Sequence, residues 1–185
     1  MNEEQQLIGE MARRMLDDHC GPEVVDRAEQ GDYPAALWTL LADNGLTTLG
    51  IEEALGGAGG TFGDALVVLR EAGRKAAPLP LAETLLAGQV LSLLGQKLPE
   101  GPMAFGQGAV TLDDEGQLKG AVHGVKFARH CKTLLIAAKR GDAWVICQIA
   151  AESVGLTEGK DLAGEARDDL DVLVQVQPEA CFAID

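Results

Sequence analysis

The sequence predicts an α+β protein, with an all-helical N-terminal domain over residues 1–98 packed on a small antiparallel β-sheet or barrel domain over residues 103–185. In the first half, apolar residues recur every three or four positions, which is typical of amphipathic helices. The second half instead contains short apolar runs separated by turn-forming residues, as in antiparallel sheets. Between the two halves, the segment Pro99-Glu100-Gly101-Pro102 marks the expected domain boundary.

The helical half begins with an amphipathic segment in which Leu7, Met11 and Met15 lie on one face. Prolines suit the first turn of a helix, and Asn-Gly suits its end. We expect helices over residues 3–19, from Pro22, from Pro34 to Asn44, from Thr61 or Asp64 to about Ala76, and over residues 81–94. The last two are apolar almost all round, so we expect them to be interior.

The second half contains two clear turn signals, Asp113–Gly116 and Lys139–Asp142, between apolar runs. We expect strands over residues 103–105, 109–112, 118–127, 133–138, 143–149 and 170–176. The two tryptophans, Trp38 and Trp144, are expected to anchor the cores of the two domains.

The composition excludes several classes of partner. The 29 acidic and 15 basic residues give a net charge of −14, which repels nucleic acid and anionic lipid. No apolar run reaches membrane-spanning length, and the first residues lack the basic and apolar regions of a signal peptide. We therefore expect a cytoplasmic protein that binds neither nucleic acid nor membranes.

Metal binding and histidine catalysis are not expected. The four cysteines are far apart in the sequence and form no C-x-x-C pair, so we expect reduced thiols and no metal site. His123 and His130 lie in the β half without a suitable nucleophile partner, which favours structural roles.

The most distinctive segment is residues 51–80, in which a glycine-rich turn leads into an apolar helix that ends before a proline pair. The turn contains four glycines between Gly56 and Gly60, and the helix ends in Glu71-Ala72-Gly73-Arg74. The turn lacks the lysine and hydroxyl pair of a phosphate-binding loop and does not have the G-x-G-x-x-G order. We therefore interpret it as a structural turn.

This order of an acidic pair, a glycine turn and a helix ending in Glu-x-Gly-Arg resembles the N-terminal helical domain of the acyl-CoA dehydrogenase family. The β half is also similar to the family's middle domain. The matching segments are Gly116–Lys126, Leu134–Lys139 and Ala143–Ile146. The family's third domain, a C-terminal four-helix bundle, has no counterpart in these residues.

The resemblance implies a flavoprotein of fatty acid metabolism that oxidises the Cα–Cβ bond of an acyl-CoA thioester with FAD. In the family the catalytic glutamate belongs to the C-terminal bundle, so no residue of this chain inherits a catalytic role. The resemblance also implies a homo- or hetero-oligomer. We expect this chain alone to be inactive, either as a truncated piece or as a subunit that a partner completes.

Two segments correspond to the family's flavin-contacting regions, and they give the candidate cofactor-binding residues. The first region contains Phe105 and Gln107, although the family's Thr-Glu-Pro motif is absent there. The second contains Phe127, Ala128 and Arg129, with the arginine where the family has a hydroxyl. Arg129 could pair with a flavin or phosphate anion, or it could be a surface residue at the end of a strand.

Two other functions stay open. The chain could be a non-catalytic paralogue that binds a partner subunit or an acyl-CoA without flavin, as the altered flavin-contacting segments suggest. It could also be an unrelated α+β binding module.

Overall fold

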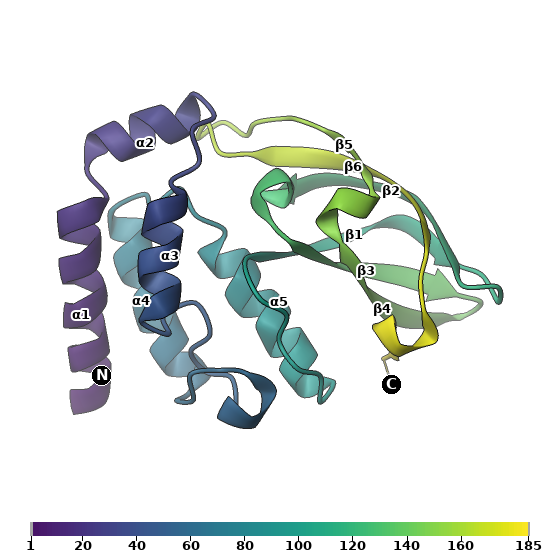
Figure 1. Cartoon of the computed structure of the whole chain (residues 1–185), viewed down its shortest axis with the longest axis horizontal. Helices are drawn as coiled ribbons and strands as arrows, with labels where there is room; N and C mark the ends of the chain where they lie inside the picture. The colour runs from purple at the N-terminus through teal and green to yellow at the C-terminus, as the bar shows by residue number, and fades with distance from the viewer. Residues whose placement is uncertain (1, 185) are drawn as a thin grey trace. The chain divides into compact units, whose positions relative to one another are not determined.

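The computed structural model describes residues 2–184, which form two compact units that divide between Leu98 and Pro99. The α-helices belong to the first unit and the β-strands to the second (Figure 1). The predicted α+β class is confirmed.

The helical unit contains the five expected helices. They are α1 (Glu3–His19), α2 (Pro22–Glu29), α3 (Ala35–Asp43), α4 (Phe62–Arg74) and α5 (Leu81–Leu93). Two of them begin with a capping box, in which the side chain before the helix and the side chain three residues later bind each other's backbone amides. Asn2 and Gln5 form this arrangement at α1, and Thr61 and Asp64 form it at α4.

The glycine turn closes on itself before α4. The amide of Gly50 donates to the carbonyl of Gly59 at 2.8 Å, and the amide of Gly59 donates to the carbonyl of Ile51 at 2.9 Å. A Cβ atom on Gly57 would lie 2.0 Å from the oxygen of Ile51. The turn therefore requires glycine so that two backbone segments can touch, which supports its interpretation as structural.

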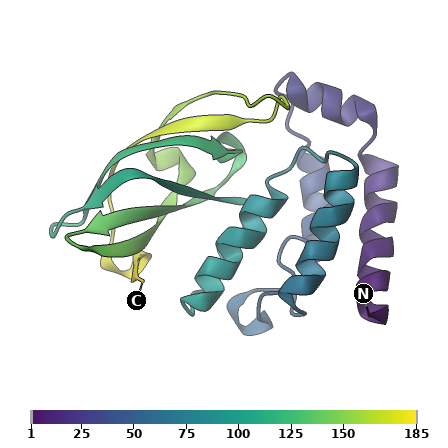
Figure 2. The same cartoon turned by 180° about the vertical axis from the view of Figure 1, so that it is seen from behind.

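Helices α1 and α4 run parallel and pack side by side, with α5 on the other side of α4 (Figure 2). Gly9 of α1 allows the close approach, because a Cβ atom there would lie 3.1 Å from Val67 of α4. The core between the helices includes Leu16, Leu41 and Leu85, together with the buried Trp38. The predicted role of Trp38 as a core anchor is confirmed.

The prediction that α4 and α5 are interior all round is wrong for one side of each helix. Leu66 of α4 is half exposed, Leu86 of α5 is 54% exposed, and Leu93 at the end of α5 is 87% exposed. The inner sides of the same helices hold fully buried residues such as Val68 and Leu85.

The second unit is built on a single sheet of seven strands in the order β5-β6-β2-β1-β3-β4-β7. The strands are β1 (Met103–Leu112), β2 (Gln117–Lys126), β3 (Thr133–Arg140), β4 (Ala143–Ala150), β5 (Gly155–Thr157), β6 (Arg167–Gln175) and β7 (Cys181–Ala183). All neighbouring pairs are antiparallel except β1 and β3, which are parallel. The expectation of an antiparallel sheet therefore holds for five of the six pairs.

Strand β1 is continuous, although the sequence predicts two short runs here. Its glycines are the reason. A Cβ atom on Gly106 would lie 3.0 Å from Ile136, and one on Gly108 would lie 2.3 Å from the carbonyl of Ala121. These glycines let β1 lie close to its neighbours, and the strand takes up a register shift against β3 between Gln107 and Thr111.

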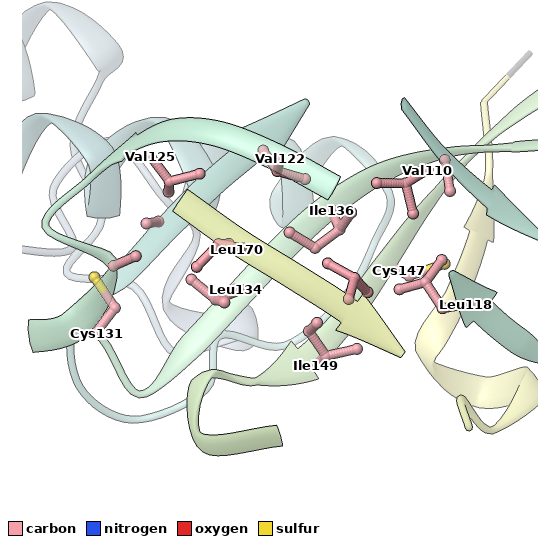
Figure 3. Close-up of a cluster of buried hydrophobic side chains, with 14 of the residues drawn as sticks. Val110, Leu118, Val122, Val125, Cys131, Leu134, Ile136, Cys147, Ile149 and Leu170 are labelled. Atoms are coloured by element: carbon pink, nitrogen blue, oxygen red, sulfur yellow. The ribbon is translucent and has the colours of Figure 1, made fainter. Parts of the chain in front are cut away.

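The sheet curls so that side chains from five strands meet in one core. Val110 of β1, Val122 of β2, Ile136 of β3, Cys147 of β4 and Leu170 of β6 all belong to this cluster (Figure 3). The predicted anchor Trp144 does not belong to it. Trp144 is 37% exposed, and the Nζ of Lys139 lies 4.4 Å from its ring centre.

Among residues 2–184, none of the helices combines the length and the apolar character needed to cross a bilayer.

Candidate functional site

The first candidate segment lies on β1, where side chains alternate between the two faces of the sheet. Phe105 and Gln107 point away from the core of the second unit and have exposed side chains. In the parallel register they lie beside Leu135 and Ala137 of β3. Phe105 and Gln107 thus share one face of β1, and both side chains can reach a ligand.

The second candidate segment is the turn that follows β2. Phe127 has a φ of 54°, a left-handed conformation that is uncommon for an aromatic residue. Its amide donates to the carbonyl of Ala166 at 2.9 Å, and its side chain is only 4% exposed. The ring packs in the core of the second unit, and the adjacent Ala128 is fully buried. Neither side chain presents a surface to a ligand in this structure.

Arg129 is held by a buried carboxylate. The backbone amide of Arg129 donates to Asp168 Oδ2 at 2.9 Å, and its Nε donates to Asp168 Oδ1 at 2.9 Å. The guanidinium also donates to the carbonyl of Gly159 at 2.6 Å and forms an ion pair with Glu158. The side chain of Arg129 is 14% exposed. Its hydrogen bond to Asp168 is the main reason that the pKa of Arg129 is raised.

Asp168 links the turn after β2 to the loop before β6. The carboxylate is fully buried and also accepts a bond from the amide of Gly159. Lys126 makes a second link between the same elements, because its Nζ lies 2.6 Å from Glu165 and 3.5 Å from Asp161. The hydrogen bond to Glu165 is the main reason that the pKa of Lys126 is raised. Charged pairs therefore hold the turn after β2 against the loop before β6.

The sequence did not single out Asp168, although the alternation along β6 carries a signal for it. Asp168 has the same parity as Leu170 and Val172, which both point into the core. An aspartate in register with core residues must be paired when it is buried. The sequence pattern alone does not show that its partner is Arg129, 39 residues earlier.

The two histidines of the second unit differ in environment. His123 is exposed, and its Nδ1 lies 3.1 Å from Asp169. His130 is partly buried next to the Arg129 and Asp168 pair, and desolvation lowers its pKa. The structural roles expected for both histidines stay predictions.

The helical unit has a charged centre of its own in the motif Glu71-Ala72-Gly73-Arg74. Glu71 is 2% exposed and lies 3.1 Å from Arg13, 2.9 Å from Arg70 and 2.9 Å from Arg74. These charge-assisted bonds, above all that from Arg13, lower the pKa of Glu71 to about 2. Because Arg13 belongs to α1 and the others to α4, the motif joins the two parallel helices.

Arg129 and Glu71 thus each take part in charged contacts that link separate elements of their own unit. The comparisons with known proteins support the resemblance found in the sequence. The model of the acyl-CoA dehydrogenase N-terminal domain matches residues 2–97. This chain belongs to the acyl-CoA dehydrogenase family.

Among curated proteins, the chain is 35% identical over 139 residues to the acyl-CoA dehydrogenase IpdE2 of Mycolicibacterium smegmatis, an alignment that covers 72% of this chain and 45% of that protein. The chain thus matches less than half the length of this relative.

Solved structures share the fold. A structure of the ChsE4-ChsE5 complex from Mycobacterium tuberculosis has a TM-score of 0.85 and 20% identity, and the match covers 99% of this chain and 57% of that chain. An acyl-CoA dehydrogenase from Bacillus anthracis in complex with FAD has a TM-score of 0.75 and 16% identity, covering 100% of this chain and 38% of that chain.

Proposed function

We propose that this chain supplies the helical and β parts of an acyl-CoA dehydrogenase whose active site is completed by a helical bundle outside these residues. The reaction is the α,β-oxidation of an acyl-CoA thioester. The bundle is either a further part of the same protein or part of a partner subunit, and the assembly is an oligomer. Family membership supports the reaction class, and the length of the relatives supports the need for additional chain.

The observation that carries this proposal is the set of exposed apolar side chains on α4 and α5. Phe62, Leu66, Leu86 and Leu93 are large apolar residues with substantially exposed side chains on these two neighbouring helices. Apolar groups of this kind normally mark an interface. In the family, the outer faces of these helices meet the C-terminal bundle, so a bundle is the occupant that fits these exposed apolar residues.

FAD, which accepts the β-hydrogen as hydride in this reaction, is the proposed cofactor. Phe105 and Gln107 fit direct contact with it, since their side chains are exposed on one face of β1. The side chains of Phe127, Ala128 and Arg129 do not fit direct contact in this conformation. The first two are buried, and the guanidinium of Arg129 already has Asp168, Glu158 and Gly159 as partners.

We therefore assign Phe127, Ala128 and Arg129 a positioning role at this cofactor site. The left-handed turn and the bonds of Arg129 to Asp168 give the end of β2 one fixed path. A fixed backbone is a precondition for holding a flat ring in one orientation. The flavin contacts of this chain alone are few, so tight binding depends on the completing bundle.

The alternative is a non-catalytic paralogue that binds a partner or an acyl-CoA without flavin. The observation that favours it is the same engagement of Phe127 and Arg129 within the second unit, because these side chains give a flavin ring neither a stacking surface nor a free cation.

Coexpression separates the two functions. The chain is produced with an acyl-CoA dehydrogenase subunit from the same genome that carries a C-terminal bundle, and the complex is analysed by native mass spectrometry and flavin absorbance. The proposal predicts a defined complex that retains FAD. A complex without FAD would favour the paralogue, and the absence of any complex with such subunits or with a longer form of this protein would contradict both.

Leu86→Asp and Leu93→Asp should each abolish the complex, since both residues are exposed on α5. A matched control is available on another helix. The substitution Leu7→Asp changes a similarly exposed leucine on α1 and should leave the complex intact.

A further inference from the structure

Two cysteines face each other between the last two strands of the sheet. Cys147 of β4 pairs directly with Cys181 of β7, and their Sγ atoms lie 3.7 Å apart. The amide of Ile184 donates to the carbonyl of Trp144, the residue opposite it, at 3.2 Å, so these two residues form a hydrogen-bonded pair. Hydrogen-bonded and non-hydrogen-bonded pairs alternate along an antiparallel ladder, and the cysteine pair lies three positions further on. Cys147 and Cys181 therefore occupy a non-hydrogen-bonded position, where opposite side chains approach most closely and the Cα separation suits a disulfide.

The two thiols differ in their access to solvent. Cys147 is fully buried in the core of the second unit (Figure 3), whereas Cys181 is only partly buried. Burial, together with the nearby Cys181 thiol, raises the pKa of Cys147 to about 12. A reagent in solution therefore meets Cys181 first, and Cys147 reacts only with a group that is already attached to Cys181.

A pocket lies next to Cys181. It has a volume of about 270 Å³, and Cys181 forms part of its wall. The rest of the wall comes from the turn between β1 and β2, from Arg140 at the end of β3, and from the segment that follows β6. A pocket of this size can admit the reactive end of a small disulfide beside Cys181.

We propose that Cys147 and Cys181 form a reversible thiol–disulfide site that takes small disulfides such as glutathione disulfide. The Cys181 thiolate attacks one sulfur of the reagent, which forms a mixed disulfide and releases one glutathione thiolate. Cys147 then loses its proton to solvent, and its sulfur attacks the Cys181 sulfur and expels the second glutathione thiolate. The protein thereby loses two electrons and two protons, and the reagent gains them.

The bond would fasten an edge of the sheet. Strand β7 has three residues and pairs only with β4 in the sheet, so few hydrogen bonds hold it in place. A disulfide across this pair joins residues that are 34 positions apart and restricts the unfolded chain accordingly. Oxidation is therefore expected to raise the melting temperature of the second unit, and reduction to restore it.

The test uses the folded 185-residue chain with glutathione disulfide, followed by alkylation of the remaining thiols, trypsin digestion and mass spectrometry. Trypsin cuts after Arg140, Lys160 and Arg167, so Cys147 and Cys181 fall in the separate fragments 141–160 and 168–185. We expect these two fragments to be joined by a disulfide, with the intact chain about 2 Da lighter than the reduced form. Cys20 and Cys131 are expected to be alkylated after denaturation.

Two variants test the order of attack. Cys147→Ala should stop at the mixed disulfide, so that Cys181 keeps one glutathione. Cys181→Ala should leave Cys147 unmodified in the folded chain and reactive after denaturation in guanidinium.

The wild-type chain alone tests the proposed thiol–disulfide site, even if a variant fails to fold. A stable glutathione adduct on Cys181 without the link, a link to Cys20 or Cys131, or no reaction at all would each overturn the proposal. A link that increases with protein concentration would also overturn it, because the pair lies within one chain.

Discussion

The buried carboxylate of Glu71 gives the clearest quantitative prediction for stability. Its side chain is 2% exposed and accepts bonds from Arg13, Arg70 and Arg74. The pKa of Glu71 falls from 4.5 to about 2, and each pKa unit corresponds to about 1.4 kcal/mol, which gives an upper bound of about 3 kcal/mol. The three arginines are half exposed, so solvent screens part of this energy. We expect Glu71→Gln to lower the free energy of unfolding at pH 7 by about 2 kcal/mol.

The pH dependence follows from the direction of the pKa change. Because the pKa of Glu71 is lowered in the folded state, its stabilisation is fully present above the unfolded-state value of 4.5. It is lost as the pH falls from there towards 2, since protonation removes the charge that the arginines bind. The difference between wild type and Glu71→Gln is therefore largest at neutral pH and shrinks below pH 4.5.

Urea unfolding followed by helical circular dichroism measures this difference, because the described α-helices all belong to the first unit. Glu52→Gln is the control, since Glu52 is an exposed carboxylate of the same unit. The control should change the stability by less than about 0.5 kcal/mol at any pH. A Glu71→Gln effect that is equally small, or one that is unchanged between pH 7 and pH 3.5, would refute the reasoning.

Three other predictions test further parts of the structure. The isolated chain should bind FAD no more tightly than on the order of tens of micromolar, and Arg129→Ala should weaken this binding slightly in a fluorescence titration while lowering the melting temperature, because the arginine positions the turn after β2; tight stoichiometric binding by the wild type that is lost in the variant would instead show that the arginine contacts the flavin. Gly57→Ala should lower the free energy of unfolding by about 3 kcal/mol, because the added Cβ atom would clash with the backbone of Ile51. Gly73→Ala should raise the free energy of unfolding by about 1 kcal/mol, because Gly73 is helical and has open space around it; equal effects of the two substitutions in urea unfolding would contradict these reasons. Leu86→Ser should reduce self-association in sedimentation experiments without unfolding the chain, whereas Leu85→Ser should unfold the helical unit. If the wild type associates and Leu86→Ser associates equally, the exposed side of α5 is not the interface.

The helices could be predicted well because their signals are local. Asn2 and Thr61 begin helices with side chains that bind the first free amides, and prolines precede α3 and α5. Which side of each helix is buried could be predicted less accurately. Leu86 and Leu85 are neighbours of the same residue type, yet one is exposed and the other is buried. Where apolar residues surround a helix, only packing determines which side is covered.

Strands β1, β2, β3, β4 and β6 were predictable as runs, whereas the three-residue strands β5 and β7 were not predicted. The partners of the strands were not predictable either. The parallel pairing of β1 with β3 depends on contacts between distant residues, which leave no local signal in the sequence. The sequence predicted two runs, 103–105 and 109–112, whereas Gly106 and Gly108 between them belong to β1 and allow the close approach of its neighbours. Trp144 matched the expected residue type of a core anchor but lies on the outer face of β4.

The candidate site was predictable in position and less so in chemistry. Phe105 and Gln107 alternate with buried residues, so their exposure follows from the strand pattern. The roles of Phe127 and Arg129 depend on Ala166 and Asp168, which approach them only in the folded sheet. Likewise, the pairing of Cys147 with Cys181 depends on the register of β4 and β7.

The reduction of bound flavin by an acyl-CoA tests the central proposal most directly. The 185-residue chain with added FAD, and the same chain assembled with a bundle-bearing subunit, are each mixed anaerobically with a series of acyl-CoA thioesters, and the flavin absorbance is followed. We expect no bleaching with the chain alone and bleaching by at least one acyl-CoA in the assembly. Bleaching by the chain alone, or an assembly that holds FAD and is not reduced by any acyl-CoA, would contradict the central proposal.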